Sequence, residues 1–118
     1  MLTEMRTVAP RIHTYADLKR ELLALAEQAL AEGERLKAAS YLRIAEFFIF
    51  PDEPAKLPTR EHFLHLVREH YGIQESDVIS IPYESGMLPA YRFTPEHPKG
   101  TLLMFASFDA YIEAYLAR

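Results

Sequence analysis

The sequence predicts an α+β chain in which three helices precede a β-hairpin, one buried strand and the start of a further helix. Two observations support this prediction. Up to about residue 71, apolar residues recur every three or four positions, which is helical spacing. After that point, short runs of β-branched and apolar residues are separated by turn residues, as in strands. With 49% hydrophobic and 25% charged residues in a chain of 118, the composition is that of a globular protein.

The first helix is expected to begin at Thr14, because its hydroxyl can accept a hydrogen bond from the backbone near Asp17, and Asp17 favours the positive end of a helix. Residues 1–13 before it are expected to be a tail. Gly33 breaks the helical spacing and permits a turn. The apolar positions of this helix are Tyr15, Leu18, Leu22, Leu25 and Ala29.

A second helix is expected over residues 34–50, with an apolar face so broad that it predicts contacts on two sides. The prolines at positions 51 and 54 stop it, because proline lacks the backbone N–H. A third helix is expected from Pro58 to about Tyr71, with Gly72 at its C-terminal end. Its buried face would carry Phe63, Leu66, Val67 and Tyr71.

The strand-like half begins with residues 78–83, a β-branched run with alternation. Residues 84–86 read as a tight connection and residues 87–93 as the antiparallel return. Residues 101–106 are apolar at nearly every position, which predicts an interior strand covered on both faces. Residues 109–118 show helical spacing again.

Composition excludes several classes of function. The net charge of −4 carries no basic stripe, so no nucleic-acid partner is expected. The absence of cysteine excludes disulfides and thiolate chemistry and fits a reducing cytoplasm. No signal-peptide pattern and no apolar run of membrane-spanning length is present, so a soluble cytoplasmic protein without membrane contact is expected. The sequence implies no cofactor.

Three strings resemble a branch of the α/β-hydrolase superfamily that carries a helical segment ahead of its catalytic domain. They are residues 41–48 (YLRIAEFF), 78–91 (VISIPYESGMLPAY) and 100–113 (GTLLMFASFDAYIE), of which the last is the most specific. The branch includes acylaminoacyl-peptidase-like esterases and C–C bond hydrolases of the pyridine-alkaloid type. The resemblance implies an α/β fold, with residues 14–72 as a helical cap-like segment and residues 73–118 as the first strands of the sheet.

The resemblance also implies functional residues. The turn after the third strand of this family supplies one backbone N–H of the oxyanion hole, which here would be that of Phe108. Ala106 and Ser107 stand where the family usually has two small residues, often glycines. The resemblance further places Phe47 and Phe48 at a substrate pocket, although packing in the core or between domains explains them more simply.

The catalytic residues of the family have no counterpart. No serine lies in the G-x-S-x-G pattern of the nucleophile, and the acid and histidine follow it in chain order. The chain therefore reads as a truncated or split hydrolase segment, without catalysis of its own. Because the family's third strand pairs with later strands, residues Leu102 to Phe105 would lack neighbours. Self-association or a complementing hydrolase segment is the expected partner.

Other interpretations of the sequence stay open. The first two helices resemble one tetratricopeptide unit, so a non-catalytic interaction module is the alternative function. A third possibility is a defective remnant. His62, His65 and Glu69 share one side of the third helix and could hold zinc, but a solvated polar face explains them more simply, and no metal is assigned.

Overall fold

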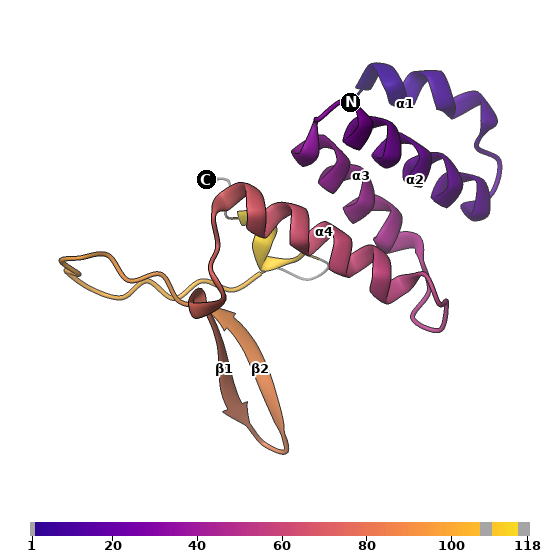
Figure 1. Cartoon of the computed structure of the whole chain (residues 1–118). Helices are drawn as coiled ribbons and strands as arrows, with labels where there is room; N and C mark the ends of the chain where they lie inside the picture. The colour runs from indigo at the N-terminus through magenta and orange to yellow at the C-terminus, as the bar shows by residue number, and fades with distance from the viewer. Residues whose placement is uncertain (1, 107–109, 116–118) are drawn as a thin grey trace. The chain divides into compact units, whose positions relative to one another are not determined.

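The computed structural model describes residues 2–106 and 110–115 of the chain. The chain divides into two compact units, Met1–His70 and Tyr71–Arg118. Four α-helices are followed by a two-stranded antiparallel hairpin, which makes this a mixed α+β protein (Figure 1).

The three predicted helices are present as α2 (Tyr15–Ala31), α3 (Arg35–Phe48) and α4 (Lys56–Tyr71). Thr14 caps α2 as predicted. Its Oγ1 accepts a hydrogen bond from the Asp17 backbone N–H at 3.1 Å, while the Asp17 carboxylate accepts from the Thr14 backbone N–H at 3.0 Å. This reciprocal pair is a capping box, which satisfies N–H groups that have no partner within the helix. Gly33, at φ +77°, turns the chain from α2 into α3.

The expectation of a tail over residues 1–13 is wrong. Residues Leu2–Val8 form the helix α1, and Ala9–Arg11 add one 3₁₀ turn, η1. Val8 is only 4% exposed, so it anchors the segment by burying apolar surface. Glu4 forms an ion pair with Lys37 of α3, and Arg11 pairs with Glu21 of α2 at 2.6 Å. Tertiary contacts of this kind stabilise a helix too short to form alone.

The core of the helical unit lies between the helices. In Figure 1, α3 runs between α2 and α4, in agreement with the prediction that its broad apolar face has contacts on two sides. Many of the buried positions are alanines, and small side chains let helix axes approach closely. The buried apolar side chains are Val8, Leu22, Leu25, Ala26, Ala29, Ala38, Ala39, Tyr41, Leu42, Ala45, Ile49, Phe63, Leu66 and Val67.

A buried carboxylate joins α3 to α4. Glu46 is 2% exposed, and its Oε1 lies 3.0 Å from Lys56 Nζ and 3.1 Å from Arg60 Nη2. Lys56 Nζ also donates to the Glu46 backbone carbonyl at 2.8 Å. Arg43 Nη1 lies 3.7 Å from the second carboxylate oxygen. A buried charge requires such partners, because water no longer solvates it.

The predicted hairpin is confirmed as β1 (Val78–Tyr83) and β2 (Gly86–Tyr91), preceded by a 3₁₀ turn, η2 (Glu75–Asp77). The register pairs Val78 with Tyr91 and Ile81 with Leu88. Residues directly opposite one another share a face, so Ile79, Ile81, Tyr83, Leu88 and Ala90 line one face of the hairpin. This face is apolar, and Ile81, Tyr83 and Leu88 on it are exposed.

The expectation of a buried strand over residues 101–106 is wrong. This segment has no regular secondary structure, and the side chains of Leu102, Leu103, Met104 and Phe105 are 87%, 73%, 51% and 78% exposed. A strand requires a neighbouring backbone to complete its hydrogen bonds, and the only sheet in the described residues is the β1–β2 pair. Beyond the segment, Ile112–Tyr115 form a 3₁₀ turn, η3, in place of the expected helix start.

None of the helices in the described part of the chain has the length and apolar character needed to cross a membrane.

Candidate functional site

The candidate site is the stretch around the predicted oxyanion turn. Phe108, the predicted backbone donor, and Ser107 before it lie outside the described residues. The structure describes the approach to the turn, residues 101–106, and the departure from it, residues 110–115.

A hydrogen bond between Tyr91 and Glu113 connects the departing segment to the hairpin. The Tyr91 hydroxyl donates to Glu113 Oε1 at 2.5 Å, and Glu113 is 8% exposed. The Tyr91 ring also stacks on Phe93 at a centroid distance of 6.1 Å. A short bond to an ionised acceptor is among the stronger hydrogen bonds in proteins. The contact therefore holds η3 against the end of β2.

Sequence reasoning missed this contact. Tyr91 and Glu113 are 22 positions apart, and neither pattern nor spacing relates them. The one feature of the sequence that could have indicated the contact is Glu113, an acidic residue among the regularly spaced apolar residues of the segment 110–116. An acidic side chain that is buried needs a hydrogen-bond partner.

The aromatic residues Phe47 and Phe48, predicted at a substrate pocket, lie at the C-terminal end of α3. Phe48 stacks on Tyr15 at 5.7 Å, and Phe47 meets Phe48 edge to face at 5.3 Å. Phe47 is 49% exposed, and the Arg43 guanidinium lies 5.7 Å from its ring centre. Phe47, Phe48 and Tyr15 thus form an aromatic cluster on the helical unit, with Phe47 at its surface.

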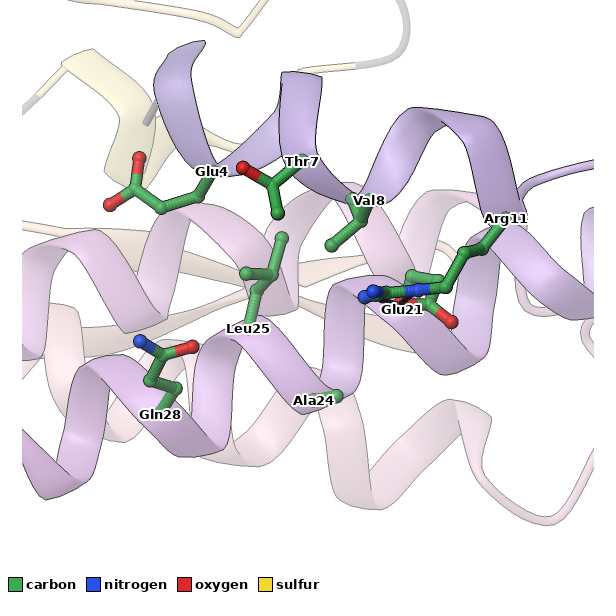
Figure 2. Close-up of a pocket in the computed structure, with 8 residues that line it drawn as sticks. All are labelled: Glu4, Thr7, Val8, Arg11, Glu21, Ala24, Leu25 and Gln28. Carbon is green, nitrogen blue, oxygen red and sulfur yellow. Dashed lines mark hydrogen bonds and ion pairs between the residues drawn. The ribbon is translucent and has the colours of Figure 1, made fainter.

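A cleft of about 250 Å³ lies elsewhere, between α1 and α2 (Figure 2). Its charged side chains are partnered: Glu4 pairs with Lys37, and Arg11 pairs with Glu21. Its lining residues are Glu4, Thr7, Val8, Arg11, Glu21, Ala24, Leu25 and Gln28. Sequence reasoning did not predict this cleft, because it depends on the unexpected helix α1.

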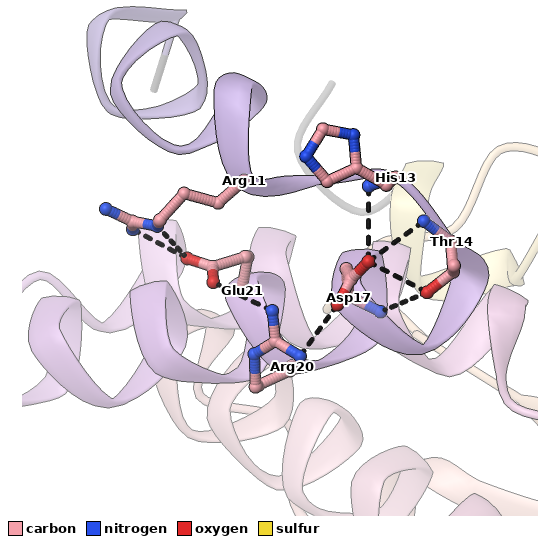
Figure 3. Close-up of polar contacts among 6 residues, drawn as sticks. All are labelled: Arg11, His13, Thr14, Asp17, Arg20 and Glu21. Carbon is pink, nitrogen blue, oxygen red and sulfur yellow. Dashed lines mark hydrogen bonds and ion pairs between the residues drawn. The ribbon is translucent and has the colours of Figure 1, made fainter.

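Hydrogen bonds and ion pairs in the first turns of α2 lower the pKa of two carboxyl groups, those of Asp17 and Glu21 (Figure 3). Hydrogen bonds from Thr14 and then Arg20 lower the pKa of Asp17 to about 2. The guanidinium of Arg11 lowers the pKa of Glu21. On α1, the Lys37 ammonium lowers the pKa of Glu4 to about 2. These carboxylates stay ionised at neutral pH, which suits structural ion pairs better than proton transfer.

The weak metal candidates His62, His65 and Glu69 lie on α4. His65 Nε2 is 3.5 Å from Glu69 Oε2, and Glu69 also forms an ion pair with Arg35 of α3. Within residues 2–106 and 110–115, no three histidine or carboxylate side chains gather closely enough to hold a metal ion. Glu69 thus connects α4 to α3 by an ion pair.

Comparisons with protein-family models, curated proteins and solved structures found no match to this chain.

Proposed function

We propose that this chain supplies the helical cap segment and the first strands of a serine α/β-hydrolase acting on esters, amides or C–C bonds. The nucleophile, the acid and the histidine come from further polypeptide, in the same chain or in another. The observation that supports this most is the run Leu102 to Phe105, which follows the hairpin, is apolar at every position and lies exposed without a paired strand.

Apolar character on both faces is typical of an interior strand of a sheet covered by helices. Solvent exposure of such a run is unfavourable, since each large apolar side chain gains about 1.5–3 kcal/mol when it is buried. Strands from a catalytic body would cover both edges of the run and satisfy its backbone groups. The run is thus suited to join a larger sheet.

Within that assembly, the backbone N–H of Phe108 would stabilise the negative oxygen of a tetrahedral intermediate. The bond from Tyr91 to Glu113 supports this role, because it anchors the chain five residues beyond the donor. The resemblance also assigns Phe47 and Phe48 to the substrate pocket of the complete enzyme, and in this chain Phe47 is half exposed and meets Phe48 edge to face. The cysteine-free chain suits a cytoplasmic enzyme.

The runner-up is a non-catalytic interaction module. The observation that favours it is the separate core of the helical unit, built on the closely packed pair α2 and α3. A unit of this kind can fold without the strand-like half. The complementation experiment described next distinguishes the two proposals, because a non-catalytic interaction module would restore no hydrolase activity to a shortened hydrolase.

The test is complementation of a hydrolase body. A serine hydrolase of the branch with a helical N-terminal segment is shortened, so that it begins after its third strand and keeps its G-x-S-x-G motif. Co-expressed with this chain, it should hydrolyse a short p-nitrophenyl ester. Its own removed segment, supplied as a separate chain, is the positive control.

The matched variant is Leu103→Lys, which places a charge at the proposed strand contact and should abolish the restored activity. Leu57→Lys, at an exposed position of α4, should leave it unchanged. If the body's own segment restores hydrolysis and this chain does not, the proposal is wrong.

A further inference from the structure

The exposed run Leu102 to Phe105 is a surface that a second copy of this chain can cover. Residues 100–106 carry no charged side chain, so two such runs can approach without electrostatic repulsion. The backbone of residues 101–106 belongs to no strand of the described chain, so no existing ladder has to be broken before it pairs. We propose that two copies pair their 102–105 runs antiparallel about a two-fold axis. This dimer does not depend on the hydrolase proposal.

The run presents a large apolar area for its length. A fully exposed large side chain presents about 150–250 Å². At the exposures of Leu102, Leu103, Met104 and Phe105, the run therefore presents roughly 500 Å² per copy. Two copies together present roughly 1,000 Å², which reaches the lower limit for a specific interface when both faces of the paired runs are covered. Ile81 and Leu88, opposite one another in the hairpin and about half exposed, enlarge the apolar surface of the same unit.

Symmetry selects the antiparallel arrangement. A closed dimer uses the same patch on both copies, related by a two-fold axis. An antiparallel ladder has this symmetry, because each residue pair exchanges equivalent hydrogen bonds. In a parallel ladder the hydrogen bonds are slanted, and the two strands make them differently. No two-fold axis then relates the two copies, so the association does not close. In the antiparallel arrangement, the axis passes near Leu103 and Met104, the centre of the run.

This geometry makes disulfide crosslinking dependent on position, and the chain has no cysteine to interfere. Residue 103 lies directly opposite residue 104 of the other copy, on the same face of the ladder, whereas Ala106 lies about five residues from Ala106 of the other copy, roughly 16 Å along the strand. A disulfide requires Cα atoms within about 7 Å. Under mild oxidation, an equal mixture of Leu103→Cys and Met104→Cys chains should therefore crosslink at least about tenfold more than Ala106→Cys alone. Crosslinking of Ala106→Cys alone as strong as that of the mixture, as in a parallel in-register pairing, would contradict the proposal.

Sedimentation equilibrium of the whole chain tests the dimer itself. The unchanged chain should be dimeric, and Phe105→Lys should raise the dissociation constant roughly a hundredfold, because each copy carries the substitution. Leu57→Lys, which adds the same charge to the helical unit, should leave the dissociation constant unchanged. Far-UV circular dichroism reports whether each variant keeps its helices, and Met104→Lys is the substitute if Phe105→Lys does not fold.

Two results would overturn the proposal: a monomer at concentrations up to roughly 0.1 mM, or aggregates that grow without limit. Failure of the hydrolase complementation would not affect either measurement, so the two proposals are judged separately.

Discussion

Replacing Glu46 by Gln should destabilise the helical unit by about 3 kcal/mol. The substitution keeps the size of the side chain and one oxygen, and it removes the charge that faces Lys56, Arg60 and Arg43. Removing one partner of a buried ion pair typically costs about 3–5 kcal/mol. The lower end applies here, because the side chains of Arg43 and Arg60 are 21% and 39% exposed and retain part of their hydration.

The assay is thermal unfolding followed by circular dichroism at 222 nm. In a domain of this size, each 1 kcal/mol shifts Tm by about 4–8 °C, so we expect a fall of about 12–24 °C. Glu61→Gln is the matched control. Glu61 is an exposed carboxylate on α4, and its loss should change Tm by less than about 4 °C. A Glu46→Gln variant that melts within a few degrees of the unchanged protein would refute the inference that this carboxylate joins α3 to α4.

Three further predictions concern local structure. Thr14→Ala removes the cap of α2 and should cost about 1 kcal/mol in urea unfolding, whereas Thr94→Ala, in an exposed loop, should cost nothing measurable. Gly33→Ala forces a side chain into φ +77° and should cost about 1–2 kcal/mol, while Gly100→Ala, with open space around it, should be neutral. The pKa of Asp17, held at about 2 against 3.8 ordinarily, means that its stabilising contribution is complete above about pH 5 and is lost as pH falls through 2. Tm measured from pH 5 to pH 2 should therefore fall less steeply in Asp17→Asn, and an unchanged slope would contradict this assignment.

Local chemistry made much of the fold predictable from the sequence. Thr14 followed by Asp17 favours a helix start from local sequence alone, because the capping bonds span only three residues. Gly33 and Gly72 mark the two helix ends that need positive φ. The alternating run at residues 78–83 specified the hairpin in the same way, through contacts between neighbouring strands.

Two elements escaped prediction because they depend on distant residues. The helix α1 is stabilised by the burial of Val8 and by the ion pair from Glu4 to Lys37, 33 positions away in the sequence. The apolar pattern of residues 101–106 indicates that the segment can be buried, but strand formation also requires a neighbouring backbone. A hydrophobic pattern cannot show whether that neighbour is present.

The candidate site was predictable only in part. The resemblance in residues 100–113 predicts a turn and a role for Phe108, and Phe108 lies outside the described residues. The contact from Tyr91 to Glu113 depends on the tertiary fold and has no signature in the sequence beyond an acidic residue at an apolar position.

Labelling with a serine-directed fluorophosphonate is the most direct test of the central claim. It is applied to this chain alone, to the shortened hydrolase body alone, and to the two co-expressed chains. We predict no label on this 13.6 kDa chain in any sample, and strong label on the body only when this chain is present. Label on this chain by itself would show that it carries an activated serine, contrary to the proposed function. Equal label on the body with and without this chain would show that the chain contributes nothing to the site.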